Sequence, residues 1–422
     1  MSLKSPSEFT ENNYLEAIDW LFAQIPNYQR DGQSAYKPGL QNITKLCDYF
    51  GNPQESLKCI HIGGTNGKGS TSNMLASILQ KAGYKIGLYN SPHLIHFTER
   101  IKVNGKQCDK LFVYEMIQKL QNVPEDIQPS FFEFTTIMAF EFFKRQNVDY
   151  AIIEVGLGGR LDATNIIKPL VTAITNVQLD HQNVLGDTIE EIAFEKAGII
   201  KSNIPVISGD DNPIVKNIIK NKALEVGAEY IDAISLEIDY PSDLQGNYQN
   251  KNKKVVFAIV EELQKLGLNI SEDNIQQGFL NVHRNTGFIG RWFVFAEKPL
   301  TICDTGHNQA GLEQVFEQLN AFPQKKHIVL GFVNDKKIDE VMKILPHNAD
   351  YYFVKPAIHR GRHPQEYQNL LEDAKIFYKI FENVQDGYLT AKQEATNEEI
   401  IFIGGSNFVV GEFLEKNLEN KE

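Results

Sequence analysis

The sequence contains no hydrophobic run long enough to cross a membrane. A spanning helix needs ~18–20 consecutive apolar residues, and no stretch of the 422 residues approaches that length. The first residues, Met-Ser-Leu-Lys-Ser-Pro-Ser-Glu, lack the apolar segment of a secretory signal peptide. We therefore expect no membrane partner and a cytoplasmic location.

Cysteine is scarce, and its spacing does not suit zinc. The four cysteines lie at positions 47, 59, 108 and 303, and none forms a CxxC pair. Three of them fall in apolar stretches, which indicates buried thiols in a reducing compartment. The sequence therefore predicts neither a disulfide framework nor a zinc centre.

Positive charge is also in short supply. The chain has 42 Lys and Arg against 54 Asp and Glu, and its formal net charge is −12. A general nucleic-acid binder needs a basic face, so we expect no nucleic-acid partner, although a local basic pocket for a phosphate remains compatible with this charge. The length suffices for two or three domains with a large core.

Short apolar runs alternate with helical patterns in two parts of the chain. In the first part we expect strands at 85–89, 149–155, 171–176 and 204–207, and helices at 11–25, 40–50, 69–82, 131–146, 189–200 and 213–226. In the second part we expect strands at 300–303, 327–331, 350–354 and 399–403, and helices at 309–320, 337–345, 364–373 and 406–417. This alternation is typical of an α/β fold with a mostly parallel sheet and helices on both faces.

We predict two α/β domains. The first spans residues 1–292 and the second, smaller and Rossmann-like, spans residues 293–422. The glycine-bearing segment 285–291 is the expected hinge. A cleft between two such domains is a common place for a ligand.

A glycine-rich turn between an apolar stretch and a helical pattern is the most informative segment. Residues 61–71 read His-Ile-Gly-Gly-Thr-Asn-Gly-Lys-Gly-Ser-Thr. Glycines let backbone N–H groups surround an anion, Lys68 adds a charge, and the following helix presents its positive N-terminus. A turn without a ligand is the weaker interpretation, because so much glycine is entropically costly. The segment predicts a P-loop, although Gly69 displaces the first hydroxyl, that of Ser70, by one residue.

Polar side chains follow three of the expected strands. Glu154 ends one strand and precedes three glycines, and a carboxylate there in an ATP-binding protein indicates a Mg²⁺ ligand. Ser91 and the Asp180-His181 pair follow two further strands, at the edge where parallel sheets place their sites. Taken singly, Ser91 also fits a Ser-Pro turn and His181 a structural histidine.

Two further motifs are ambiguous when read from their residues alone. Lys196 lies near the C-terminus of an expected helix, where a solvated or capping lysine is the usual case, although small neighbours at 193 and 197 indicate close packing. Asp304 ends a strand of the second part and is followed by His307. These two residues fit either a contact offered across the cleft or an ordinary loop.

Taken in order, these motifs resemble the dihydrofolate synthase/folylpolyglutamate synthase family, a branch of the Mur-ligase superfamily. The resemblance covers nearly the whole chain and rests on Gly64-Thr-Asn-Gly-Lys-Gly-Ser70, Ser91-Pro-His-Leu94, Glu154-Val-Gly-Leu-Gly-Gly-Arg-Leu-Asp-Ala-Thr-Asn165, Asp180-His181, Glu195-Lys-Ala-Gly198, Asp304-Thr-Gly-His-Asn308 and the segment 404–412. It implies a P-loop ATPase domain followed by a glutamate-ligase domain. The late hydroxyl of the P-loop is a feature of this branch.

The resemblance also implies a set of site residues. Those expected to contact ATP are Thr65, Asn66, Gly67, Lys68, Gly69, Ser70, Asn252, Arg291 and Asp304. Those expected to hold Mg²⁺ are Ser91, Glu154, His181 and Lys196, the last as a carbamylated lysine that ligates a second ion. Those expected in the pterin-binding region are Ala35, Tyr36, Lys37, Pro38, Ser130, Phe132, Leu161 and Asp162. Lys68, Lys196 and His307 are the expected catalytic residues, with His307 near the phosphates.

The activity implied is an ATP- and Mg²⁺-dependent ligase in folate biosynthesis. It would add L-glutamate to 7,8-dihydropteroate and to tetrahydrofolates through an acyl phosphate, as a monomer, with domain closure excluding water. One alternative is a ligase for another acid, such as a cell-wall nucleotide peptide. The P-loop starts so early that it leaves little room for a separate UDP-binding domain. The other alternative is a non-catalytic nucleotide-binding module, which the intact set of metal-ligating residues disfavours.

Overall fold

The computed structural model describes residues 9–24, 39–334, 338–346 and 348–418. The chain divides into two compact units: Met1–Asp243 with Gln249–Phe288, and Leu244–Tyr248 with Ile289–Glu422. The division at 288–289 falls close to the boundary expected at 292. The grouping of 244–248 with the second unit was not expected. Both units contain a mainly parallel sheet with helices, which is the fold class predicted from the sequence.

The first unit contains a sheet with the strand order β4-β3-β2-β5-β1-β6-β7-β8. In this order, the neighbouring strands β2, β5, β1, β6, β7 and β8 are parallel to one another. Strands β3 and β4 extend the β2 edge in antiparallel pairing. The strands are β1 Cys59–Gly63, β2 Ile86–Tyr89, β3 Ile101–Val103, β4 Lys106–Gln107, β5 Tyr150–Glu154, β6 Pro169–Ile174, β7 Val206–Ser208 and β8 Tyr230–Asp232. The central β1 is buried throughout, as expected of a strand covered on both faces.

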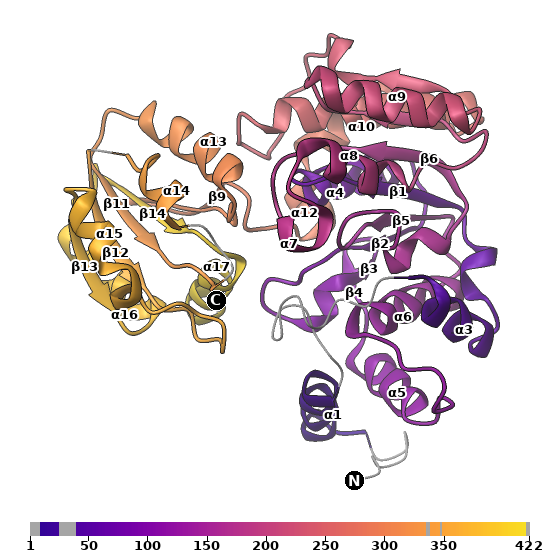
Figure 1. The fold of residues 1–422 in the computed structure, drawn as a ribbon, viewed down its shortest axis with the longest axis horizontal. Coiled ribbons are helices and arrows are strands. Elements are labelled where there is room, and N and C mark those ends of the chain that lie inside the picture. Colours follow the sequence, from indigo (N-terminus) through magenta and orange to yellow (C-terminus); the bar gives the residue numbers. More distant parts are fainter. Residues whose placement is uncertain (1–8, 25–38, 335–337, 347, 419–422) are drawn as a thin grey trace. The chain divides into compact units, whose positions relative to one another are not determined.

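Helices cover the two faces of this sheet (Figure 1). On one side α4 packs against β1, β2 and β5 and against α10, α11 and α12; α6 packs against β2, β3 and α3. The helices are α1 Glu11–Gln24, α3 Gln41–Tyr49, α4 Lys68–Lys81, α5 Lys110–Leu120, α6 Phe131–Arg145, α7 Gln182–Leu185, α8 Ile189–Ala197, α9 Pro213–Glu225, α10 Gln249–Lys265, α11 Glu272–Leu280 and α12 Val282–Thr286. Short 3₁₀ turns are η3 Pro53–Ser56, η4 Phe97–Arg100, η5 Ala163–Ile166 and η6 Ala233–Ser235.

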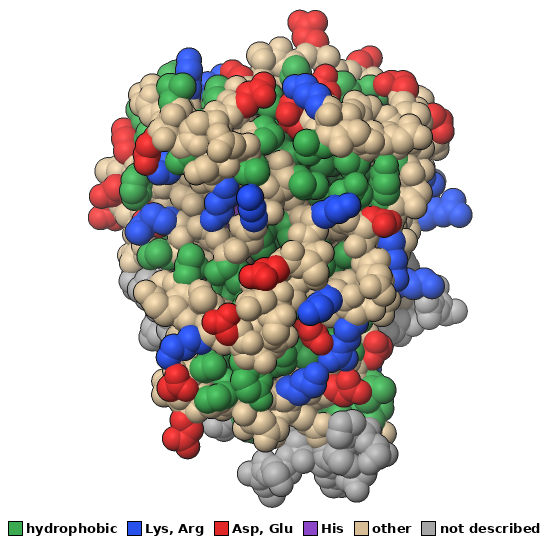
Figure 2. Space-filling model, turned by 90° about the vertical axis from the view of Figure 1, so that its right-hand side faces the viewer, with side chains coloured by type: hydrophobic (Ala, Val, Ile, Leu, Met, Phe, Trp, Pro, Cys, Tyr) green, Lys and Arg blue, Asp and Glu red, His purple; other side chains and the backbone are tan. Residues whose placement is uncertain are grey.

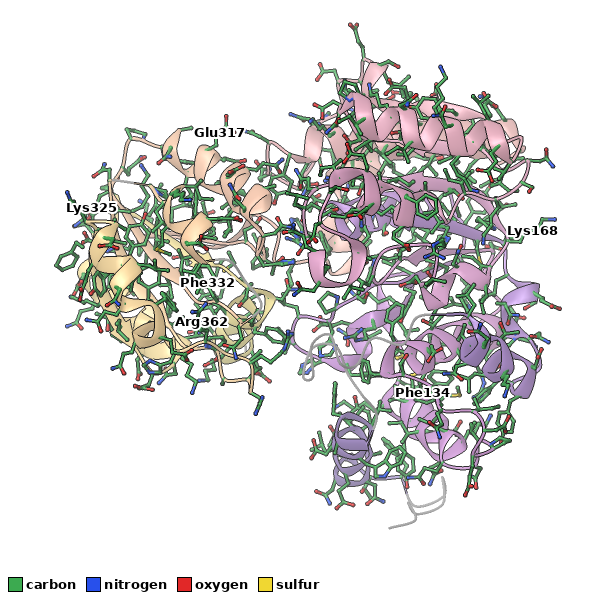
Figure 3. All side chains as sticks on the ribbon, in the orientation of Figure 1. Phe134, Lys168, Glu317, Lys325, Phe332 and Arg362 are labelled. Carbon is green, nitrogen blue, oxygen red and sulfur yellow. The ribbon has the colours of Figure 1, made fainter. Side chains whose placement is uncertain are left out.

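The start of α6 shows how the sequence fixes a helix end. Ser130 Oγ accepts a hydrogen bond from Glu133 N (3.2 Å), and Glu133 Oε2 accepts one from Ser130 N (2.6 Å). This reciprocal capping box satisfies two backbone donors that a helix leaves without partners. The helix then buries an aromatic-rich face that includes Phe134, which is fully buried and is labelled in Figure 3.

The second unit contains a sheet with the order β13-β12-β11-β14-β10-β9, in which only the β9–β10 pair is antiparallel. The strands are β9 Phe293–Glu297, β10 Leu300–Cys303, β11 Lys326–Leu330, β12 Ala349–Val354, β13 Phe377–Phe381 and β14 Ile400–Gly404. The helices are α13 Gln309–Asn320, α14 Ile338–Met342, η7 Pro364–Tyr367 (3₁₀), α15 Gln368–Asp373, α16 Val384–Glu394 and α17 Asn407–Leu418. Phe332, labelled in Figure 3, lies fully buried in the core of this unit.

Among the described residues, no helix combines the length and apolar character that a membrane span requires. All four cysteines are buried thiols, as expected for three of them from the sequence. On the face drawn in Figure 2, acidic and basic side chains are interspersed.

Candidate functional site

The predicted phosphate-binding loop joins β1 to α4. Gly67 precedes α4 with φ 85°, a backbone conformation that glycine adopts without strain. A Cβ atom on Gly64 would lie 1.9 Å from Thr175 Oγ1, and one on Gly67 would lie 2.3 Å from Asn252 Oδ1. These two glycines are therefore required by close approach as well as by backbone conformation.

Two lysines converge on one carbonyl oxygen of this loop. Lys68 Nζ donates to Gly64 O and Thr65 O, each at 3.0 Å. Lys196 Nζ, from the last turn of α8, donates to the same Gly64 O at 3.0 Å. Two lysine amino groups thus meet at the strand–helix junction, where the helix N-terminus favours an anion.

Burial changes the character of Lys196. The side chain is only 4% exposed, so the solvated lysine that the residues alone favoured is wrong. Burial, followed by repulsion from Lys68, lowers the pKa of Lys196 to about 7, and Asp180 and Asp162 oppose the shift. A large share of this amine is therefore neutral near pH 7, which is the form that reacts with CO₂.

The segment after β6 holds the loop in place. Asn176 accepts from Thr65 N through its backbone oxygen and from Asn66 N through Oδ1, both at 2.9 Å. Gln178 Oε1 accepts from Asn66 Nδ2 at 2.6 Å. Sequence reasoning missed Asn176 and Gln178, although both lie in the motif that ends at Asp180-His181. Their proximity to the P-loop follows from the parallel pairing of β1 with β6.

The predicted metal ligands Ser91 and Glu154 lie together beside the first turn of α4. Glu154 is 4% exposed, and its Oε2 accepts from Asn90 Nδ2 (2.7 Å) and Ser91 N (3.3 Å). The same oxygen would lie 3.9 Å from a Cβ on Gly69. Asn73 Nδ2 bridges Gly69 O (2.8 Å) and Asn90 Oδ1 (3.2 Å). Sequence reasoning missed Asn73 and Asn90, which fix the orientation of the carboxylate.

His181, the third predicted metal ligand, lies after β6 with φ 52° and precedes α7. Its backbone N donates to Asp180 Oδ1 at 2.9 Å, and its Nε2 lies 3.9 Å from Asp180 Oδ2. The described part of the chain contains no cluster of three or more His, Cys, Asp or Glu side chains placed to hold a metal. The oxygen donors of Ser91 and Glu154 suit Mg²⁺, and the joint role of His181 with them stays a prediction.

Two residues of the predicted pterin region, Asp162 and Phe132, contact the same loop. Asp162 is buried, and its carboxylate accepts hydrogen bonds from the N–H groups of Gly156 (3.1 Å), Leu157 (2.9 Å) and Thr164 (3.0 Å) and from the Thr164 hydroxyl (2.5 Å). Burial raises the pKa of Asp162, and these hydrogen bonds oppose the shift. The half-buried Phe132 ring abuts the same loop, because a Cβ on Gly156 would lie 2.4 Å from it.

The structure describes two further residues predicted for the pterin region. Leu161 is half-buried in the loop that precedes Asp162, and Ser130 caps α6. Residues 35–38, also predicted to bind the pterin, lie outside the described residues.

The predicted nucleotide contact Asn252 lies against the P-loop. It is 5% exposed on α10, and its Nδ2 donates to Gln249 Oε1 at 2.8 Å. Gln249 Nε2 in turn lies 3.1 Å from Ser70 Oγ. Gln249 was not singled out from the sequence as a site residue, yet it links Asn252 to the first hydroxyl after the P-loop lysine.

In the second unit, Asp304 follows β10 and is 1% exposed. Its carboxylate accepts from Tyr248 Oη (2.6 Å), Trp292 N (2.8 Å) and Gly306 N (2.7 Å), and it lies 3.7 Å from the Arg291 guanidinium. Burial and Asp304 together raise the pKa of Tyr248 well above its usual value. His307 Nδ1 lies 3.0 Å from Thr305 O. Contact of Arg291, Asp304 and His307 with a nucleotide stays a prediction.

Comparison with known proteins matches both units to Mur ligase domain families. Residues 62–253 match the Mur ligase middle domain, and residues 290–407 match the Mur ligase, glutamate ligase domain. The α/β fold, the P-loop and these matches define the class as a Mur-type, ATP-dependent ligase.

Individual relatives narrow the class further. The dihydrofolate synthase/folylpolyglutamate synthase of Escherichia coli is 31% identical over 89% of this chain and 90% of its own length. A probable bifunctional folylpolyglutamate synthase/dihydropteroate synthase of Haloferax volcanii is 31% identical, and the chain spans about half of that protein (50%). The chain belongs to the dihydrofolate synthase/folylpolyglutamate synthase family.

Solved structures agree with this assignment. A structure described as E. coli FolC in complex with DHPP and ADP has a TM-score of 0.84 at 28% identity and covers 97% of this chain and 98% of that one. A bifunctional folylpolyglutamate synthase/dihydrofolate synthase with Mn, AMPPNP and L-glutamate bound has a TM-score of 0.80 at 28% identity, covering 90% and 94%.

Proposed function

We propose that this protein joins L-glutamate to 7,8-dihydropteroate and to tetrahydrofolates, with hydrolysis of ATP to ADP and phosphate. The observation that carries the proposal is the convergence of Lys68 and Lys196 on Gly64 O, beside the buried Glu154. The relatives named for this activity, and the neighbours solved with ADP, AMPPNP, DHPP and L-glutamate, support it.

An amide bond cannot form directly from a carboxylate, because the carboxylate is a poor electrophile. In the proposed reaction the substrate carboxylate attacks the γ-phosphorus of ATP, ADP leaves, and an acyl phosphate forms. The glutamate amine then attacks the acyl carbon, loses a proton and expels inorganic phosphate. The chemistry is mainly positioning and charge stabilisation.

The residues of the P-loop supply that stabilisation. Thr65 to Ser70 surround the phosphates, Lys68 offsets the charge that develops on the transferred group, and Asn252 packs against the loop on the nucleotide side. Ser91, Glu154 and His181 would hold Mg²⁺, which when bound neutralises phosphate oxygens. Lys196, once carbamylated, would change from a cation into an anionic oxygen ligand.

The acid substrate is assigned to the region of Ser130, Phe132, Leu161 and Asp162. The half-buried Phe132 ring offers an aromatic surface to a pterin, and Asp162 fixes the adjoining loop. Arg291, Asp304 and His307 of the second unit are assigned to the nucleotide. We also assign a monomeric state and a cytoplasmic location, which four buried thiols fit.

The test is an ATP-turnover assay with glutamate that compares dihydropteroate, tetrahydrofolate and no acceptor. Dihydropteroate labelled with ¹⁸O in its carboxylate tests the route. The proposal expects acceptor-dependent ADP release and one ¹⁸O atom in the released phosphate. ADP release at the same rate with and without either acceptor would refute the substrate assignment. Unlabelled phosphate would refute the acyl-phosphate intermediate.

A further inference from the structure

A buried histidine lies behind the candidate substrate loop. His61, in the central strand β1, is 0% exposed, and its Nε2 lies 2.8 Å from Thr164 Oγ1. Its other ring nitrogen, Nδ1, has no hydrogen-bond partner among the described residues. Buried polar atoms are normally paired, so a half-paired histidine in the strand that feeds the P-loop needs an explanation.

The directions of the hydrogen bonds assign the tautomer of His61. Thr164 Oγ1 donates its single hydrogen to Asp162 Oδ1 at 2.5 Å. The same hydroxyl oxygen can then only accept from His61, so the imidazole carries its proton on Nε2. Burial and the charge of Lys201 lower the pKa of His61 to about 3, which leaves the ring neutral and Nδ1 without a proton. The single available N–H is therefore used on Thr164.

The chain of contacts continues into the loop that follows Glu154. Asp162 Oδ2 accepts from the backbone N–H groups of Gly156 (3.1 Å) and Leu157 (2.9 Å). Gly156 packs against the Phe132 ring, where any larger residue would collide. The conformation of this loop therefore determines the surface that Phe132 and the loop present together.

We propose that His61 is a positioning residue for the acid substrate. Its Nε2–H holds the Thr164 hydroxyl on Asp162, and Asp162 then holds the backbone at Gly156 and Leu157 in the conformation that receives the substrate. This inference rests on the proposed function. The plain alternative is that Asp162 only caps η5, since it also accepts from Thr164 N at 3.0 Å.

We call the hydrogen bonds from His61 through Thr164 and Asp162 to the loop the relay. Thr164→Val tests it, because valine keeps the shape of threonine and removes the hydroxyl. We expect the KM for dihydropteroate to rise about tenfold, which corresponds to ~1.4 kcal/mol and is the size of one hydrogen bond. The KM for ATP should stay within about twofold, and Thr164→Ser should restore the wild-type KM. His61→Leu should match Thr164→Val, whereas His61→Gln, which keeps an N–H donor, should recover part of the loss.

Thr172→Val is the matched control. Thr172 lies opposite His61 on the neighbouring strand β6, is fully buried, and its hydroxyl has no hydrogen-bond partner among the described residues. Its substitution removes the same atoms from the same region of the sheet and should leave both KM values unchanged. A lowered melting temperature of Thr164→Val with unchanged KM values, or an equal rise in both KM values, would overturn the positioning role.

The tautomer provides a measurement that does not depend on turnover. In ¹⁵N-labelled wild-type protein at pH 7, the His61 ring should show a proton on Nε2 and none on Nδ1. A proton on Nδ1 would overturn the relay. If the wild type fails to use dihydropteroate, the proposed function fails and the ¹⁵N spectrum still decides the relay. If the wild type is active and Thr164→Val equals it, only the positioning inference fails.

Discussion

Lys196 should take up CO₂ with a pH dependence set by its buried position. Its pKa is lowered from 10.5 to about 7, so about half of the amine is neutral at pH 7. An unperturbed lysine is only about 0.03% neutral at the same pH. The reactive fraction is therefore on the order of a thousand times larger than for a surface lysine. Between pH 6 and pH 8 it should rise from about 9% to about 90%.

The assay is ¹³C NMR of the protein in ¹³C-bicarbonate over this pH range. We expect one carbamate resonance whose rate of appearance, at constant dissolved CO₂, has a midpoint near pH 7, and we expect Lys196→Ala to abolish it. Lys326→Met is the control, because Lys326 is a buried lysine of the second unit whose Nζ donates to Phe322 O at 2.6 Å. Its substitution should leave the resonance unchanged.

The same variant separates a carbamylated Lys196 from an unmodified one. A wild-type protein that shows no carbamate at pH 8, or a carbamate that persists in Lys196→Ala, would exclude Lys196 as the modified residue. Activity of Lys196→Ala close to that of the wild type would separately exclude an anionic role for this position. Partial rescue of Lys196→Ala by short-chain carboxylates would support that role.

Other substitutions test the remaining parts of the site. Lys68→Ala should lower turnover at least ~100-fold, the cost of losing a preorganised charge contact, and near-normal turnover by a folded variant would remove the P-loop assignment. Glu154→Gln keeps the shape of the side chain and removes its charge, so the Mg²⁺ concentration for half-maximal activity should rise by at least about tenfold; an unchanged Mg²⁺ titration would favour a purely structural Glu154. Without bicarbonate, the unfolding free energy should rise with pH between about 7 and 10.5, because the unfolded chain keeps the Lys196 proton longer than the folded chain does. Lys196→Met should flatten that slope and stabilise the protein at pH 7 by up to about 4 kcal/mol, as measured by denaturant titration.

The two α/β units were predictable because local periodicity carries most of their information. Helix α13 has the predicted bounds, and α4 and α6 agree with prediction to within a residue at each end. The hairpin of β3 and β4 was missed although Asn104-Gly105, with φ values of 47° and 75°, is a strong turn signal between two very short strands. Strands β8, β9 and β13 and helices α5, α7, α10, α11, α12 and α16 were also missed.

The candidate site was predictable where a motif is continuous and unpredictable where partners are distant. The P-loop and Glu154 could be recognised from adjacent residues. The environment of Lys196 could not, because its partner Gly64 lies 132 positions away. His61 and Thr164 are likewise separated by 103 positions. Patterns within one element say which face is buried, but they do not say which atom of another element lies opposite.

The shared carbonyl of Gly64 has a consequence for the thermodynamics of nucleotide binding. Both amino groups contact one oxygen; burial, followed by repulsion from Lys68, lowers the pKa of Lys196 to about 7, so this amine is partly deprotonated in the nucleotide-free protein. A bound nucleotide, which is a polyanion, favours the protonated form of Lys196 and so raises its pKa. Nucleotide binding and proton uptake are then linked functions: calorimetric heats should differ between buffers of different ionisation enthalpy, and CO₂, by consuming the same amine, should reduce the number of protons taken up.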